Sequence, residues 1–130
     1  MSKYITSTKP ESFYINILGV KYKVVFCTKE EDSLLETIDG YCDNTTKEII
    51  IQWFEDEPMN HSDMYEYTKR CIRHEIVHAM LFQCGLDSNS VKQWARNEEM
   101  VDWIAIQLHK LNKVCHEAEE KYEEAISIII

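Results

Sequence analysis

The sequence predicts an α+β domain in which a small antiparallel or mixed sheet packs on two helices. Before residue 54, apolar residues alternate with polar ones, as in half-buried strands, and beyond residue 63 they recur at helical spacing. The chain has 130 residues, of which 45% are hydrophobic, and this suffices for one core but not for two. We therefore expect a single domain over residues 1–130, with residues 1–11 and 113–130 peripheral.

Two hairpins are expected in the first half of the chain. Residues 13–17 and 22–26 alternate in hydrophobicity on either side of Gly19, which suits a tight turn. A second hairpin is expected to turn at residues 43–46, with Ile49, Ile50 and Ile51 in a buried strand. Between the hairpins, residues 28–37 are charged and predict either a short helix or a loop.

The second half of the chain predicts two long helices. Ser62 or Asn60 can cap a helix over about residues 63–84, and Gly85 can end it. The flank of this helix that we expect to pack against the sheet consists of Ile72, Ile76, Ala79 and Met80. After a connection over residues 86–95, a second helix is expected from about residue 96 to residue 111, largely buried because apolar residues cover most of its surface. Residues 112–127 are charged and helical in composition.

The segment from His74 to His78 reads HEIVH, which is an HExxH pattern. On a helix the two histidines lie one turn apart and roughly 40° apart around the axis, so both imidazoles can bind one metal ion. Glu75 lies beside them, where its carboxylate can take a proton from a metal-bound water without binding the metal. About one chain in fifty of this composition contains the pattern by chance, so the motif needs support from elsewhere in the chain.

A carboxylate at suitable spacing supplies that support. Glu98 follows His78 by twenty residues, and Asp102 lies one helical turn after Glu98. Catalytic zinc usually has three protein ligands and keeps the fourth position for water, and two histidines with one glutamate are a known set. We therefore predict one zinc ion bound by His74, His78 and Glu98. Asp102 is expected to accept the remaining ring N–H of His74 and so to orient that ligand.

These residues also allow other assignments. Cys71 could join the two histidines in a structural zinc site, but such a site needs four side-chain ligands, and no second Cys or His cluster lies at finger spacing. Glu99 is the alternative to Glu98, but its neighbour one turn later is Trp103 instead of an acid. Further candidates, for which packing or surface roles are favoured, are the oxyanion donors Tyr41, Tyr65 and Tyr67 and the additional ligands His61, His109 and His116.

These motifs resemble those of small zinc metallopeptidases. HEIVH followed by NEEMVD is similar to the gluzincin peptidases of the thermolysin type, and the run from Glu98 to Ala105 resembles the second helix of ImmA/IrrE-like peptidases. The size of the chain suits the ImmA/IrrE-like group better than the thermolysin type. The chain is most similar to short phage- or prophage-encoded zincin-like proteins, in which a β-hairpin precedes the HExxH helix and an NEE-type segment opens the next helix. The resemblance, which covers roughly residues 12–112, implies a compact zincin-like fold, a helix bearing HExxH beside a second helix bearing the glutamate, and zinc-dependent peptide hydrolysis with Glu75 as the general base.

The resemblance also implies how a substrate binds. In zincins an edge strand above the active-site helix pairs with the substrate backbone, and residues 39–54 are the candidate here. An ordinary core strand is the equally weighted alternative for this segment. No oxyanion donor is assigned, because the chain is too short for the additional domain that supplies it in thermolysin-like enzymes. The alternative function is that of a zinc-binding regulatory or structural protein of phage type with little or no hydrolytic activity.

The composition limits which partners and which cellular compartment are expected. The formal net charge of −9 disfavours nucleic acid and anionic membranes as partners, since both require a basic patch, and a peptide or protein substrate is expected. No stretch approaches the roughly eighteen apolar residues of a membrane helix. Five cysteines without a CxxC pair argue against a disulfide scaffold, so we expect a cytoplasmic protein, in the host cytoplasm if phage-encoded, whose cysteines are mostly buried. The apolar residues 125–130 are expected to dock on the domain or on a partner.

Overall fold

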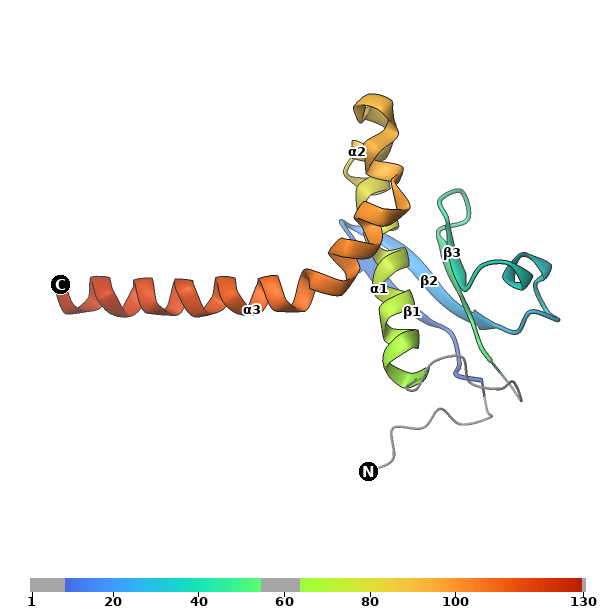
Figure 1. Cartoon of the computed structure of the whole chain (residues 1–130), viewed down its shortest axis with the longest axis horizontal. Helices are drawn as coiled ribbons and strands as arrows, with labels where there is room; N and C mark the ends of the chain where they lie inside the picture. Colours follow the sequence, from blue (N-terminus) through green and yellow to red (C-terminus); the bar gives the residue numbers. More distant parts are fainter. Residues whose placement is uncertain (1–8, 55–63, 130) are drawn as a thin grey trace.

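The structure is a computed structural model that describes residues 9–54 and 64–129, and its α+β class agrees with the prediction. Strands occupy the first half of the chain and helices the second (Figure 1). In chain order the elements are β1 (Phe13–Ile17), β2 (Val20–Cys27), the 3-10 helix η1 (Ser33–Glu36), β3 (Gly40–Asp43), β4 (Glu48–Gln52), α1 (Met64–Gln83), α2 (Leu86–Asn89), the 3-10 segment η2 (Val91–Arg96) and α3 (Glu98–Ile129).

The four strands form one mixed sheet in the order β1-β2-β4-β3. Both predicted hairpins are confirmed, since β1 pairs antiparallel with β2 and β3 pairs antiparallel with β4, while β2 and β4 run parallel. The first hairpin turns through Leu18 and Gly19, whose φ values are 51° and 87°. Gly19 adopts its positive φ without steric cost because it has no Cβ. The backbone N–H of Gly19 also donates to Asn16 Oδ1 over 2.8 Å. In this order β3 forms an edge of the sheet.

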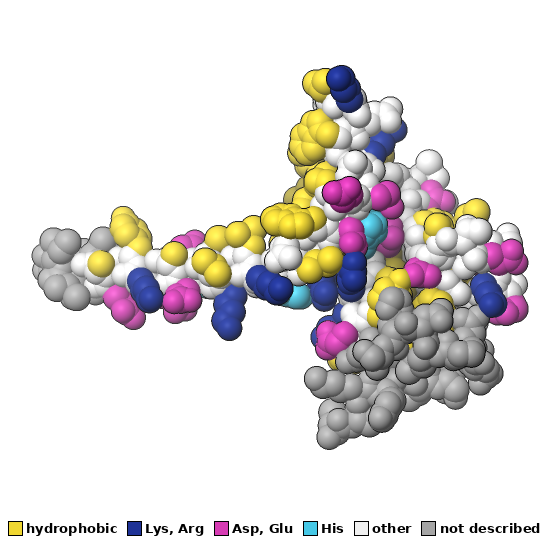
Figure 2. All heavy atoms as spheres, in the orientation of Figure 1, with side chains coloured by type: hydrophobic (Ala, Val, Ile, Leu, Met, Phe, Trp, Pro, Cys, Tyr) yellow, Lys and Arg dark blue, Asp and Glu magenta, His cyan; other side chains and the backbone are white. Residues whose placement is uncertain are grey.

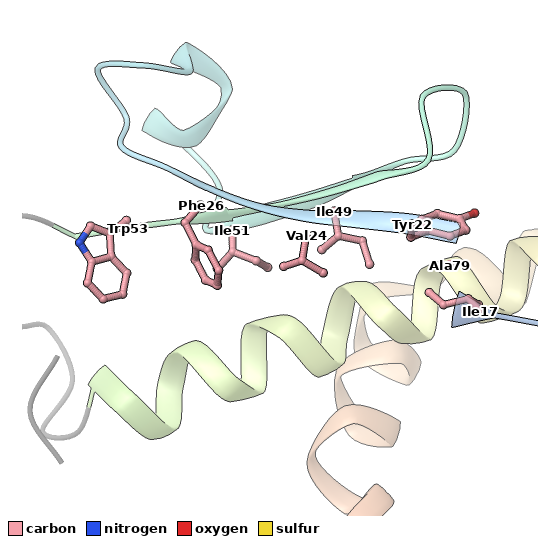
Figure 3. Packing of buried hydrophobic residues seen from close by; sticks show 8 residues of the cluster. All are labelled: Ile17, Tyr22, Val24, Phe26, Ile49, Ile51, Trp53 and Ala79. Carbon is pink, nitrogen blue, oxygen red and sulfur yellow. The ribbon is translucent and has the colours of Figure 1, made fainter. Parts of the chain in front are cut away.

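The core lies between the sheet and α1 (Figure 3). Alternation along β2 turns Tyr22, Val24 and Phe26 to the helix, and all three are at most 5% exposed. From β4, Ile49 and Ile51 complete this face of the sheet. Burying an aliphatic or aromatic side chain of this kind contributes roughly 1.5–3 kcal/mol, so this layer holds α1 against the strands.

The flank of α1 that contacts the sheet is narrower than expected. Ile72, Ile76 and Ala79 pack there as predicted, but Met80 is 41% exposed, and its predicted burial is wrong. Met80 lies roughly 80° around the helix from Ile72, beyond the reach of the strands. The predicted caps Ser62 and Asn60 lie outside the described residues.

The first turns of α3 pack on the side of α1 that the sheet leaves uncovered. Val77 of α1 forms a small cluster with Val101 and Ala105, and the latter two are 0% exposed. Arg73 strengthens the contact, because its Nε–H donates to the Ala105 carbonyl oxygen over 3.0 Å. The small side chain of Ala105 allows this close approach of two helix backbones.

Beyond this contact α3 leaves the body of the protein, so the prediction of a largely buried helix ending near residue 111 is wrong. The helix continues to Ile129 and projects away from the sheet (Figure 1). Trp103, Leu108 and Leu111 are 61%, 42% and 58% exposed, and every side chain from residue 108 to residue 125 is exposed. We call residues 98–107 the root of α3 and residues 108–125 the arm.

The cysteines are less buried than expected. Cys27, Cys42 and Cys71 are half-buried, Cys84 and Cys115 are exposed, and all five are free thiols. The prediction that most of them are buried is therefore wrong. Within residues 9–54 and 64–129, no helix is both long and apolar enough to cross a membrane.

Candidate metal centre

Two helices bring His74, His78 and Glu98 together. The histidines lie one turn apart on α1, and Glu98 is the first residue of α3. The candidate ligand atoms of the three side chains all lie within 4.8 Å of one another. His78 Nε2 is 2.5 Å from Glu98 Oε1, and His74 Nε2 is 3.5 Å from Glu98 Oε2. The same carboxylate thus faces the Nε2 atoms of both rings.

The start of α3 explains how Glu98 reaches this position. The Met100 backbone N–H donates to the side-chain oxygen of Asn97 over 2.8 Å, so Asn97 caps the helix just before Glu98. The Glu98 side chain is 72% exposed, whereas those of His74 and His78 are 16% and 20% exposed. Glu98 is therefore more exposed than expected for a residue of the largely buried helix that the sequence predicts. The site opens to solvent on the side of its carboxylate.

The donor set fits a zinc ion. Zinc takes histidine nitrogen and carboxylate oxygen at about 2.0–2.2 Å, so tetrahedral ligand atoms lie roughly 3.5 Å apart, which needs only small adjustments of these side chains. The two imidazole ring centres are 5.0 Å apart and the rings are inclined by 66°. Burial lowers the pKa of His78, which favours the neutral ring that binds metals, although the Glu98 carboxylate opposes this shift.

Asp102 lies behind His74, as predicted, and has a second partner that the sequence analysis missed. Asp102 Oδ1 is 3.4 Å from His74 Nδ1, and Arg70 Nη2 donates to Asp102 Oδ2 over 2.7 Å. Burial tends to raise the pKa of Asp102, but the hydrogen bonds and charges of Arg70 and, to a smaller extent, His74 together outweigh it and lower that pKa. A carboxylate held in this way can orient His74. Arg70 lies one helical turn before His74, and that spacing was the available signal.

Glu75 points under the sheet. Its side chain is 6% exposed, and burial, with a smaller effect of the Glu98 charge, raises its pKa to about 8. A Cβ atom on Gly40 of β3 would lie 3.6 Å from Glu75 Oε2 and only 2.9 Å from the Ile50 carbonyl oxygen. Glycine is therefore required where β3 pairs with β4, because a larger residue would clash with the Ile50 carbonyl. This role of Gly40 was not predicted from the sequence.

A groove runs between β3 and α1 over the three candidate ligands. It consists of one hollow of about 240 Å³ and another of about 270 Å³, which share Ile38, Gly40, Glu75 and Glu98 in their walls. Arg70 lines the first hollow and Asp87 the second. Figure 2 shows acidic side chains gathered around histidine where α3 meets the body. Both the candidate ligands and the edge strand thus face one open channel.

The other predicted candidates lie apart from the three ligands or are engaged elsewhere. The Tyr67 hydroxyl lines the groove but donates to Asp39, and the Tyr41 hydroxyl donates to Asp32 over 2.5 Å. Cys71 packs against the core, and burial raises its pKa to about 11. His61 lies outside the described residues, whereas the candidates with exposed side chains are Tyr65, Glu99, His109 and His116.

The predicted site residues are therefore close neighbours in the structure. His74, Glu75, Glu98 and Asp102 line one hollow, and His78 lies in the wall of the next. No family model, no curated protein and no solved structure matches this chain.

Proposed function

We propose that this protein is a zinc-dependent metallopeptidase with a zincin-like fold, similar to the gluzincin and ImmA/IrrE-like enzymes. The observation that carries the proposal is the geometry of His74, His78 and Glu98, whose donor atoms lie within 4.8 Å of one another. Two histidines and a glutamate leave a fourth position of a tetrahedral zinc open, which is typical of catalytic sites and differs from the closed set of structural ones.

These three side chains would hold one zinc ion. A zinc ion supplies Lewis-acid chemistry, which polarises a carbonyl and makes water a stronger acid. Glu75 takes the proton of the attacking water and delivers it to the amine that leaves, as amide hydrolysis requires. Its position one residue after His74 keeps it beside the ligands, and the strand above it shields it from bulk water.

The edge strand supports a peptide as the substrate. β3 pairs with β4 on one side, and among the described strands no other pairs with its second side. The backbone groups of an edge can pair with an extended peptide, which gives affinity for any sequence. Gly40 and Cys42 of β3 line the groove, so a peptide added there passes over Glu75.

Asp102 and Arg70 support the metal from behind. Asp102 holds the Nδ1 side of His74, which leaves Nε2 to face the metal position. Arg70 fixes Asp102 through its 2.7 Å hydrogen bond. Residues that orient ligands in this way typically contribute a factor of about 10–100 to metal affinity or activity.

A metal analysis combined with peptide-library cleavage tests the proposal. The Glu75→Gln variant is expected to keep a zinc content near one per chain, because Glu75 does not bind the metal, and to lose turnover. Glu99→Gln is the matched control, since Glu99 lies in the first turn of α3 with an exposed side chain. It should retain both zinc and activity. A Glu75→Gln variant as active as the wild type would contradict the mechanism.

The alternative is a zinc-binding regulatory or structural protein. It is favoured by one observation, namely that Tyr67, Tyr41 and Arg70, which line the groove, already donate to carboxylates. An oxyanion would then lack a ready donor. If the wild-type protein binds zinc and unfolds on chelation but cuts no peptide in the library, the structural role holds and the peptidase does not.

A further inference from the structure

The arm of α3 carries an apolar stripe with a strict heptad repeat. Counted from Ile104 in the root, the spacing alternates between four and three residues over more than three turns. The stripe spans roughly 100° of the helix surface. Its members on the arm are Leu108, Leu111, Cys115, Ala118, Tyr122 and Ala125. A repeat of 3.5 residues is the signature of a helix that winds around another helix.

Beyond Ile104, which packs beside Val77 and Val101, the described body of the protein does not cover this stripe. Figure 1 shows the arm pointing away from the sheet and α1, and Figure 2 shows hydrophobic side chains along one edge of it. Leu111 and Tyr122 are 58% and 66% exposed. Because α3 is continuous from Glu98 to Ile129, its far end lies some tens of ångströms from the root at about 1.5 Å per residue. Within residues 9–54 and 64–97, no other element of the chain can reach the stripe while the helix is intact.

We propose that the arm pairs with the arm of a second copy of this chain in an antiparallel coiled coil. The charges of the arm favour this occupant and this direction. Residues 109–116 carry Lys110 and Lys113 and no acid, whereas residues 117–124 carry five glutamates and one lysine. Antiparallel pairing places the basic half of each arm against the acidic half of the other. Parallel pairing would place the two acidic halves side by side.

The sizes of the stripe residues favour the same direction. One antiparallel register places Leu108 against Ala125 of the second copy, Leu111 against Tyr122, and Cys115 against Ala118. Every layer then contains at most one aromatic ring, and the small residues at the centre allow the helices to approach closely. In the parallel register each residue meets its own copy, so two Tyr122 rings crowd one layer and two Ala118 side chains leave a void in another.

The root provides an apolar contact surface for the far end of the second copy's arm. In this register the last turns of α3 from one copy lie beside residues 104–108 of the other. Trp103 is 61% exposed there, next to the stripe. Tryptophan is enriched in the centres of protein interfaces, where it buries a large surface. Pairing of the arms would thus cover Trp103 and the stripe together.

The mass in solution tests the pairing. Sedimentation velocity of the full chain across micromolar concentrations should give a dimer, and the double variant Leu108→Asn/Leu111→Asn should give a monomer. The matched control is His109→Asn/His116→Asn, which introduces the same side chains on the opposite face of the exposed arm. Zinc content should be unchanged in both, because none of the substituted residues lies beside the candidate ligands. A monomeric wild type, or a dimer that survives the stripe variant, overturns the proposal.

A cross-linking experiment tests the direction. Wild-type chain, which carries Cys115, is mixed with a tagged Cys115→Ala/Ala118→Cys chain and mildly oxidised. The antiparallel register places these two thiols in one layer and predicts a disulfide between the tagged and the untagged chain. The parallel register predicts links only between identical chains. Predominance of links between identical chains would overturn the antiparallel assignment.

Discussion

The root and the arm of α3 belong to one helix and have opposite surroundings. In the root, Val101 and Ala105 are 0% exposed and Asp102 contacts both His74 and Arg70. In the arm, Leu111 and Val114 are 58% and 63% exposed, although they are no less hydrophobic. Helical spacing creates an apolar face in both regions, but only a neighbouring element determines whether that face is buried. The root touches α1 and carries part of the candidate site, whereas the arm meets no other element among the described residues.

The largest expected effect comes from removing the ligand at the head of the root. Glu98→Ala should abolish stoichiometric zinc binding, because two histidines alone do not complete the set. Zinc at a hundredfold excess over its dissociation constant should stabilise the wild-type protein by about 2.7 kcal/mol, and this gain should vanish in the variant. Thermal unfolding with zinc and with a chelator measures both effects. Glu99→Ala, at the neighbouring exposed position, should behave as the wild type does.

Two valines, one in the root and one in the arm, allow the packing of these two regions to be compared. Val101→Ala removes two methyl groups from a fully buried position and should lower the free energy of unfolding by about 2 kcal/mol. Val114→Ala removes the same atoms from the arm and should change it by less than about 0.5 kcal/mol in dilute solution. Urea unfolding of the two variants provides the comparison. Equal losses would show that the arm packs against the body of its own chain.

The carboxylate behind His74 should have a smaller effect than the ligand itself. Asp102→Asn keeps the shape of the side chain but weakens its interaction with the ring N–H of His74 and with Arg70. Zinc affinity is expected to fall about tenfold, which corresponds to about 1.4 kcal/mol. Competition with a fluorescent chelator measures it. An unchanged affinity would mean that the 3.4 Å contact between Asp102 Oδ1 and His74 Nδ1 does not orient the ligand.

The smallest effect is expected from an ion pair on the arm. Lys121 Nζ lies 3.2 Å from Glu117 Oε1, and both side chains are largely exposed. Such pairs contribute about 0.3–0.5 kcal/mol on a helix surface. Lys121→Gln should therefore shift the urea midpoint very little at low protein concentration. A loss as large as that of Val101→Ala would contradict the view that the arm is solvated in the single chain.

Local patterns predicted well which candidate residues lie close together, because each pair depends on a short stretch of one helix. His74 and His78 share a turn, and Glu98 and Asp102 share another, so spacing alone puts each pair on one face. The strands were likewise predictable from alternation in residues 13–26. The other features depend on how distant segments meet. The role of Arg70 depends on α3, which brings Asp102 to it. The role of Gly40 depends on the pairing of β3 with β4 above Glu75.

The exposure of the arm could not be predicted from apolar content. Leu108 and Leu111 belong to a sequence rich in hydrophobic residues, and nothing in that composition says whether a body or a second helix covers them. The strict 3.5-residue repeat was the available signal, because a helix packed on a globular core shows a broader stripe. Met80 illustrates the same point on α1. It is apolar and follows the buried Ala79, yet it lies just outside the contact with the sheet.

Because α3 is unbroken, it can pivot as one rigid body about its contact with α1. Val101 and Ala105 form this pivot, where the Ala105 carbonyl also accepts a hydrogen bond from Arg73. Glu98 lies roughly 8 Å to one side of it, and the end of the arm roughly 33 Å to the other, at about 1.5 Å per residue. A sideways displacement at the tip therefore reaches Glu98 reduced about fourfold and reversed in direction. The position of one candidate zinc ligand is thus mechanically coupled to whatever holds the distant end of the helix.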